Sequence, residues 1–168
     1  MSHEEHRADA PKTLAVGVLS VSSTRSLETD ESGHWIARGA EGQGHKVVYH
    51  QVVPDDADAI RQAVTRLLAE AAPHAVIVTG GTGLSPLDVT IEALKPLFTK
   101  ELTAFAVLFA QLSFEEIKSA AILSRASAGI IGRSVVFCIP GSIKACQLAC
   151  NRLIFPELGH IIRHCRGN

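Results

Sequence analysis

The sequence predicts a three-layer α/β domain in which a mostly parallel sheet is covered by helices on both faces. Short apolar runs of strand length alternate along the chain with segments of helical periodicity. Continuous apolar strands between helices are typical of a parallel sheet that is buried on both sides. With 168 residues, of which 46% are hydrophobic, the chain can bury the core of one such domain.

The first half of the chain predicts three strands and two helices. Residues 13–22, 45–53 and 75–79 are apolar runs of strand length. After the first strand, a polar loop leads to a helix that starts near Asp30 or Ser32 and ends near Gly42 or Gly44. Pro54-Asp55-Asp56 opens a second helix, whose apolar residues recur at helical spacing: Ile60, Val64, Leu67, Leu68 and Ala71.

The second half predicts helices over residues 88–98 and 102–112, followed by a short piece from Phe114. Residues 134–139 form a further strand, which leads through a Pro-Gly turn to a last helix, from Ser142 towards Leu153. Pro156 is expected to interrupt this helix because proline lacks an N–H group. The predicted domain covers residues 13–168, and the polar residues 1–12 are expected to form a disordered tail.

The composition excludes several classes of function. The 16 basic and 17 acidic residues leave a net charge of −1, so the chain lacks the electrostatic footprint of a nucleic-acid or membrane-surface protein. No segment is long and apolar enough to span a bilayer, and the N-terminus lacks the apolar core of a signal peptide, so we expect a cytoplasmic protein. The spacing of the four cysteines, Cys138, Cys146, Cys150 and Cys165, fits neither a zinc site nor a disulfide framework. Cys146 and Cys150 are four residues apart and share a helix face; they are expected to be buried thiols of a core-facing helix, with half of a metal site as the alternative. The tail histidines His3 and His6 are candidate metal ligands, although a solvated tail explains them better.

Three polar loops follow predicted strands and are expected to form the binding site. They are rich in Ser, Thr, Gly and Asp and cover residues 22–30, 79–88 and 140–142. In open parallel sheets, ligands bind beyond the carboxyl ends of the strands, at a switch point in strand order.

The Gly-rich loop Thr79-Gly80-Gly81-Thr82-Gly83 is the strongest candidate among the three. Its glycines carry no Cβ and tolerate positive φ, so successive N–H groups can converge on one anion, and two Thr hydroxyls add donors. The loop therefore predicts a phosphate site, with a simple tight turn as the alternative.

Two carboxylates lie close to this loop in the sequence. Asp88 follows it by five residues, where it is either the cap of a helix or a ligand that holds Mg²⁺ between phosphate oxygens. Glu92, four residues later, can share the same helix face. Asp55 has the same two interpretations, as the cap of the second helix or as a second carboxylate at a strand end.

The other two loops offer polar groups. Ser142, after Gly141, is either an N-cap or part of a second anion site at a helix start. In the first loop, polar groups of a ligand could be bound by Ser22, Ser23, Thr24 and Arg25, although a solvated loop explains these residues as well.

An ordered set of motifs from Thr13 to the C-terminus resembles the molybdenum cofactor biosynthesis protein B family, together with its relative MogA and the equivalent domain of gephyrin. The segments that carry the resemblance are Val21 to Arg25, Asp30 to Gly33, Thr79 to Gly83, Asp88 to Glu92, Leu112 to Ile117, Ser124 to Ala126, Pro140 to Ser142 and Pro156 to His160.

The resemblance implies a molybdopterin-binding fold with the pterin phosphate near the Gly-rich loop. Active family members transfer the adenylyl group of ATP to molybdopterin with Mg²⁺. By this resemblance Asp88 and Asp55 match the functional carboxylates, and Asp88 is assigned as the Mg²⁺ ligand. The substrate-binding residues are expected to be Thr79, Gly80, Gly81, Thr82, Gly83, Ser22, Ser23, Gly141 and Ser142. Members of this branch are commonly hexamers and MogA relatives trimers, so a homo-oligomer, and a hexamer before a trimer, is expected.

Some positions depart from the family pattern. Leu87 stands where a basic residue often precedes the aspartate, and Val107 stands where an acid is common. Ser23 replaces an Asp or Asn. These departures weaken the case for catalysis more than the case for binding. Two functions therefore stay open, a molybdopterin adenylyltransferase and a non-catalytic molybdopterin-binding or carrier protein.

Overall fold

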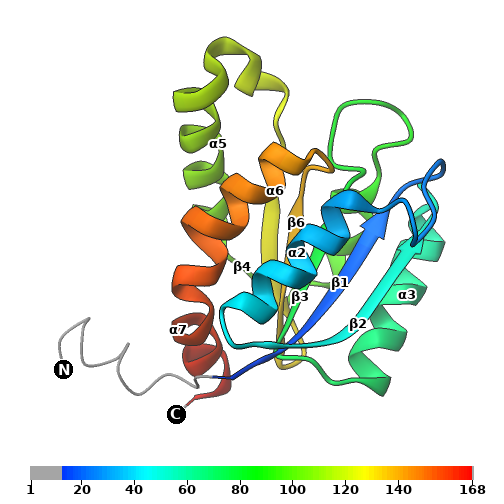
Figure 1. Cartoon of the computed structure of the whole chain (residues 1–168), viewed down its shortest axis with the longest axis vertical. Coiled ribbons are helices and arrows are strands. Elements are labelled where there is room, and N and C mark those ends of the chain that lie inside the picture. Colours follow the sequence, from blue (N-terminus) through cyan, green and yellow to red (C-terminus); the bar gives the residue numbers. More distant parts are fainter. Residues whose placement is uncertain (1–12, 168) are drawn as a thin grey trace, which may run out of the picture.

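The fold is a six-stranded sheet between two layers of helices, as seen in a computed structural model that describes residues 13–167 (Figure 1). The tail predicted for residues 1–12 lies outside the described residues. The elements in chain order are β1 (Ala15–Val21), α2 (Glu31–Gly42), β2 (Lys46–Val53), α3 (Ala57–Glu70), β3 (Ala75–Thr79), α4 (Thr90–Leu94), β4 (Lys100–Glu101), α5 (Thr103–Ile117), β5 (Ser127–Ile131), β6 (Ser134–Ile139), α6 (Ile143–Ala149) and α7 (Phe155–Arg166).

The sheet has the strand order β2-β1-β3-β6-β5-β4. The first four strands in this order are parallel, whereas β5 pairs antiparallel with β6 and β4 pairs antiparallel with β5. The predicted α/β class with a mostly parallel sheet is confirmed. The two antiparallel strands were not predicted, because β4 has only two residues and β5 carries Ser, Ala and Gly in place of a continuous apolar run. A two-residue turn with Gly132 at φ 61° joins β5 to β6, as a type II′ hairpin allows.

Two apolar cores hold the layers together, one on each face of the sheet. Helices α2, α5, α6 and α7 pack on one face, where fully buried residues include Ile36, Phe137 and Leu158. Helices α3 and α4 cover the other face, where Ile60 and Leu94 are fully buried. The helices that connect β1 to β2 and β2 to β3 thus lie on opposite faces, which places a switch point in strand order between β1 and β3.

The C-terminal helices form a continuous helical segment rather than two separate ones. A π-helical turn (Cys150–Ile154) joins α6 to α7, and Pro156 lies in the first turn of α7. Proline cannot donate to the preceding turn, and its ring collides with a carbonyl there, so the wider turn accommodates it. Pro156 therefore changes the helical pattern without ending the helix.

A buried carboxylate fixes the start of α2 against the sheet. Asp30 is the N-cap of α2, and only 1% of its side chain is exposed. Its Oδ1 accepts from Gly33 N at 3.0 Å, and its Oδ2 accepts from Ser20 Oγ at 2.6 Å and lies 2.8 Å from His50 Nε2. Burial acts to raise the pKa of Asp30, but the hydrogen bonds with His50, Ser20 and the Gly33 amide hold the pKa below its usual value. Asp30 thus ties α2 to both β1 and β2.

Gly33 is required at this junction because no Cβ fits beside the carboxylate. A Cβ at Gly33 would lie 2.0 Å from Asp30 Oδ2 and 2.4 Å from His50 Nε2. We expect Gly33→Ala to lower the free energy of unfolding by about 2 kcal/mol or more, because the buried hydrogen-bonded groups must move apart. Gly42→Ala, in the same helix with no atom within 4 Å of its Cβ position, is the matched control and should be neutral or stabilising. Chemical denaturation of both variants checks this, and equal stabilities would contradict it.

The lowered pKa of Asp30 predicts a specific dependence of stability on pH. A carboxylate whose pKa is lower in the folded state stabilises the fold above its unfolded pKa of about 3.9, and this contribution is lost as the pH falls through the folded value. Asp30→Asn, which keeps a good N-cap, should lower the free energy of unfolding by about 1–3 kcal/mol at pH 7. The difference from wild type should shrink as the pH falls below about 4, because the unfolded chain binds the Asp30 proton before the folded chain does, and it should be lost once the pH has passed the lowered folded value.

Denaturation curves at pH 7 and pH 3 measure this effect. Asp58→Asn is the control, because Asp58 is 74% exposed and pairs only with Arg61 at the surface. A pH-independent deficit for Asp30→Asn would show that its charge does not matter.

Candidate functional site

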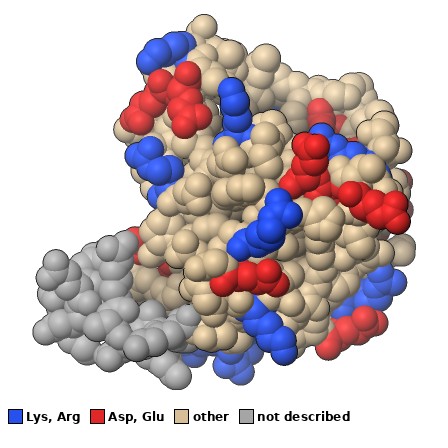
Figure 2. Space-filling view, in the orientation of Figure 1, with Lys and Arg blue, Asp and Glu red and all other residues tan. Residues whose placement is uncertain are grey.

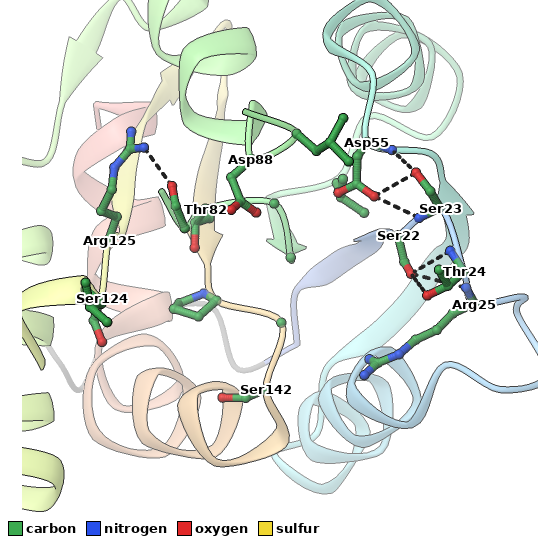
Figure 3. A pocket seen from close by; sticks show the side chains of 18 of the residues that line it. Ser22, Ser23, Thr24, Arg25, Asp55, Thr82, Asp88, Ser124, Arg125 and Ser142 are labelled. Carbon is green, nitrogen blue, oxygen red and sulfur yellow. Dashed lines mark hydrogen bonds between the residues drawn. The ribbon is translucent and has the colours of Figure 1, made fainter. Parts of the chain in front are cut away.

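A cleft of about 740 Å³ lies at the carboxyl ends of the parallel strands, beside the switch point between β1 and β3. Loops after β1, β2, β3 and β6 form most of it, and the segment after α5 closes one side (Figure 3). The lining residues are Val21 to Arg25, Asp55, Gly80 to Gly83, Leu87, Asp88, Ile117, Ala120, Leu123, Ser124, Arg125 and Pro140 to Ser142. The three loops predicted from the sequence thus meet in one cleft.

The Gly-rich loop is in close backbone contact with the loops on either side. Gly80 and Gly81 have φ angles of 99° and 64°, which only glycine adopts readily. A Cβ at Gly80 would lie 2.3 Å from the Val21 carbonyl oxygen, and one at Gly81 would lie 2.4 Å from Thr90 Oγ1. Gly141 is also tightly packed, although less closely, since its Cβ position is 3.2 Å from the Cα atom of Gly80. The glycines are therefore needed for packing as well as for conformation.

Thr90 determines which way the loop peptides face. Its hydroxyl donates to the Gly80 carbonyl at 2.8 Å, and its N–H donates to the Gly81 carbonyl at 2.9 Å. In a trans peptide the N–H points opposite to the C=O, so the amides of Gly81 and Thr82 are directed away from α4. Within residues 13–167, the N–H groups of Gly81, Thr82 and Gly83 donate no hydrogen bond. Three successive amides are thus available to an anion.

Two members of the predicted loop site have other roles. The N–H of Gly80 donates to the Ile139 carbonyl at 3.0 Å, so it is not available to a ligand, although Gly80 lines the cleft. Thr79 does not line the cleft, because its hydroxyl is buried and donates to the Pro140 carbonyl at 3.0 Å. The expectation that Thr79 binds substrate is therefore corrected, since this hydroxyl joins the end of β3 to the loop after β6. Thr82 lines the cleft but is only 2% exposed.

Asp55 faces the cleft and is held there by Ser23. Its Oδ2 accepts from the N–H of Ser23 at 2.8 Å and from the Ser23 hydroxyl at 2.7 Å, while the Asp55 N–H donates back to Ser23 Oγ at 3.0 Å (Figure 3). Asp56 caps α3 by accepting from the Ala59 N–H at 2.8 Å. Of the two interpretations of Asp55, the helix cap is thus excluded, and Ser23 positions this carboxylate.

Asp88 lies against the Gly-rich loop and is not a helix cap. The N-cap position of α4 is Val89, which makes no side-chain capping bond. Asp88 Oδ2 accepts from the N–H of Ser85 at 2.8 Å, and a Cβ at Gly83 would lie 2.7 Å from this oxygen. The predicted helix at residues 88–98 is shortened to α4 because a turn containing Ser85 and Asp88 precedes it.

Each of these two carboxylates keeps one oxygen for a ligand. Among the described residues, neither Asp55 Oδ1 nor Asp88 Oδ1 accepts a hydrogen bond. The part of the chain that the structure describes holds no group of three or more His, Cys, Asp or Glu residues suited to a metal ion. Mg²⁺ commonly takes one or two carboxylates and completes its shell with water and substrate phosphates, so this donor set fits Mg²⁺ bound together with a nucleotide.

Arg125 is a cleft residue that the sequence reasoning did not assign to the site. Its Nη1 donates to the Gly83 carbonyl at 2.9 Å, and its Nη2 pairs with Glu92. Burial acts to raise the pKa of Glu92, but the hydrogen bond and charge of Arg125 keep the pKa below its usual value. Glu92 thus forms an ion pair with Arg125 and does not line the cleft. Arg125 lies in the segment Ser124 to Ala126, which resembles the family, and this position is the sequence signal that could have identified it as a site residue.

The remaining predicted residues surround the same cleft. Ser142 and Arg25 lie across it from Asp55 and Asp88 (Figure 3). Ser142 is the N-cap of α6, where its Oγ accepts from the Ala145 N–H at 3.3 Å, and the Gly141 carbonyl accepts from Ser32 Oγ at 2.8 Å. Ser22 Oγ accepts from the N–H groups of Thr24 and Arg25 at 3.3 and 3.2 Å, which orders the first loop.

The two departures from the family pattern lie in different places. Leu87 lines the cleft and is 63% exposed, so it presents an apolar side chain at the rim. Val107 is 66% exposed on α5 and does not line the cleft of this chain. The departure at Val107 therefore does not change the lining of the cleft within one chain.

The surface carries charges of both signs. On the face shown in Figure 2, Lys and Arg are interspersed with Asp and Glu, and no patch of one sign dominates. None of the described helices has the length and apolar character needed to cross a membrane.

Comparison with known proteins gives one consistent family. The family model described as "Probable molybdopterin binding domain" matches residues 17–160. The molybdenum cofactor biosynthesis protein B of Bacillus subtilis is 45% identical over 167 residues, which cover 99% of this chain and 98% of the relative.

Solved structures agree with this result. A crystal structure of a molybdenum cofactor biosynthesis protein B superposes with a TM-score of 0.91 at 43% identity and covers 95% of this chain and 100% of its own. The tungsten cofactor synthesizing protein MoaB from Pyrococcus furiosus superposes with a TM-score of 0.85 at 38% identity, covering 94% and 99%. The fold, the ordered motifs and these similarities over nearly the full length agree, and the chain belongs to the molybdenum cofactor biosynthesis protein B family.

Proposed function

We propose that this protein binds molybdopterin in the cleft and adenylylates it with ATP and Mg²⁺, in the cytoplasm. The observation that carries the proposal is that three amides, at Gly81 to Gly83, which donate no hydrogen bond within the described residues, share one cleft with the carboxylates Asp55 and Asp88. Amides suit a phosphate, and carboxylates suit the cation that accompanies a nucleotide.

In this proposal the pterin phosphate binds at the Gly-rich loop. Successive N–H groups that face one cavity act together as an anion site, and the absence of Cβ atoms at Gly81 and Gly83 lets a phosphate approach the backbone closely. Arg25 adds positive charge across the cleft, and Arg125 adds it beside the loop. The Arg125 guanidinium also donates a hydrogen bond to the Gly83 carbonyl, which stabilises the loop.

In this reaction an oxygen of the pterin phosphate attacks the α-phosphorus of ATP, a P–O bond forms, and the bond to pyrophosphate breaks. Two polyanions must come together, so alignment and charge neutralisation supply most of the catalysis. Asp88, assisted by Asp55, would hold Mg²⁺, which neutralises phosphate charge when bound. Ser23 keeps Asp55 oriented before any ligand binds, because three hydrogen bonds join the two residues.

A second candidate function is a binding or carrier protein that does not adenylylate. Leu87 favours the carrier function. Its exposed apolar side chain lies at the rim of the cleft, where a basic residue would stabilise the charge of a bound triphosphate. Incubation with molybdopterin, ATP and Mg²⁺ separates the two functions. Adenylylated molybdopterin supports the enzyme, whereas binding without product supports the carrier.

Asp88→Asn tests the role of the carboxylate. The amide keeps an oxygen that can accept from the Ser85 N–H, so the loop should stay folded, but the charge for Mg²⁺ is lost. We expect the rate of adenylylation to fall by about 100-fold or more, while molybdopterin binding changes little. The matched control is Asp56→Asn, which alters the N-cap of α3 outside the cleft and should keep wild-type activity. Full activity of Asp88→Asn would show that the proposed role is wrong.

We further propose that the protein is a homo-oligomer, a hexamer before a trimer. Helix α5 and the turn after it expose large apolar side chains, namely Val107, Leu108, Phe114, Ile117, Ile122 and Leu123. Exposed apolar groups gathered on one element are typical of a surface that another subunit covers.

Phe114→Glu tests this surface. Phe114 is 57% exposed in the single chain, so the charge should leave the subunit folded but disrupt subunit contact. We expect a lower molar mass by light scattering, whereas Leu27→Glu, at an exposed position away from α5, should keep the wild-type mass. An unchanged mass for Phe114→Glu would remove α5 from the interface.

A further inference from the structure

Two histidines of α7 bring their ring nitrogens together far from the cleft. His160 and His164 are four residues apart, so they lie on the same face of the helix. Their Nε2 atoms are 3.0 Å apart, and their ring centroids are separated by 4.7 Å. Neither residue lines the Gly-rich cleft.

This spacing matches the distance between two ligands of one metal ion. Imidazole nitrogens bind Zn²⁺ at about 2.0–2.1 Å, so two ligands of one ion lie about 2.9 Å apart at a right angle and about 3.3–3.4 Å apart at the tetrahedral angle. The 3.0 Å between the two Nε2 atoms lies within this range, so little rearrangement of the helix or of the side chains is needed to chelate an ion.

The carboxylate of Glu157 determines which ring nitrogen of His160 can bind a metal. Glu157 Oε2 lies 3.2 Å from His160 Nδ1. A carboxylate only accepts hydrogen bonds, so Nδ1 carries a proton, and in the neutral ring Nε2 then has the lone pair. Carboxylate–histidine pairs of this kind commonly orient metal-binding imidazoles. In the apo protein that lone pair can accept the Nε2 proton of His164, and a metal would replace this hydrogen bond.

Of the charged groups near His160 and His164, some oppose and others favour the binding of a cation. Arg163 and Arg166, in the last turn of the same helix, oppose a cation. Glu157 offsets them, and the negative end of the helix dipole favours positive charge near residue 164. Cys165 is adjacent in sequence, but burial raises the pKa of its thiol, which disfavours the thiolate form needed by a metal.

We propose that His160 and His164 form a two-histidine site for a divalent cation of the zinc, nickel and copper class. Imidazole ligands favour these ions over Mg²⁺ and Ca²⁺. Because the described residues contain no cluster of three or more His, Cys, Asp or Glu ligands, the remaining coordination positions fall to water or to groups outside these residues. The site should therefore bind more weakly than a four-ligand structural zinc site.

Calorimetric titration of the full chain with ZnCl₂ at pH 7.5, with excess Mg²⁺ present for the cleft carboxylates, tests the site. Wild type should bind one zinc ion per chain. His164→Gln should raise the dissociation constant at least about tenfold, because one of two ligands is lost and His164 is exposed enough for the fold to tolerate the change. The matched control is the double variant His3→Gln and His6→Gln, which removes the two histidines that are three residues apart near the N-terminus and should bind zinc as wild type does.

Thermal unfolding gives a second readout. A metal that binds only the folded state raises the unfolding temperature, so zinc should shift wild type more than His164→Gln. Undiminished binding by His164→Gln, loss of binding in the tail variant, or no binding by wild type up to about 1 mM zinc would each overturn the proposal.

Discussion

The orientation of the Gly80 and Gly81 peptides is the constraint on which the cleft depends. Thr90 binds both carbonyls, and a trans peptide must then direct its N–H the opposite way. A side chain at either glycine would collide with the Val21 carbonyl or with the Thr90 hydroxyl. The loop can therefore offer amide hydrogens to an anion only while both positions lack a Cβ.

Buried hydrogen bonds at the strand ends hold the rest of the cleft in place around this loop. Asp30 fixes the start of α2 to β1 and β2, and Ser32, in the first turn of α2, donates to the Gly141 carbonyl. On the other side, Thr79 joins the end of β3 to Pro140. The loops after β1, β3 and β6 are thus connected through polar groups that are shielded from water, where each bond contributes more than it would at the surface.

Hydrogen bonds within the chain hold both carboxylates of the cleft in position. Ser23 holds Asp55, the Ser85 amide holds Asp88, and each carboxylate keeps one oxygen facing outward from these bonds. Preorganised charge of this kind suits both binding and phosphoryl-group chemistry, because little reorganisation is left for the reaction itself. Leu87 at the rim presents an apolar side chain at a position where the family pattern often has a basic residue.

The sequence by itself determined the parallel strands β1, β2, β3 and β6, the helices between them and the three loops of the site, because apolar periodicity and turn residues are local signals. It could not reveal β4 and β5, whose short or small-residue strands are stable only through pairing with β6. Only the tertiary structure decided that Thr79 faces inward, that the Gly80 amide is already bonded, that Asp55 is bound by Ser23 and that Arg125 reaches Gly83. Each of these contacts joins residues from different loops or strands, and neither periodicity nor spacing along the chain specifies which of two polar neighbours will meet a distant partner.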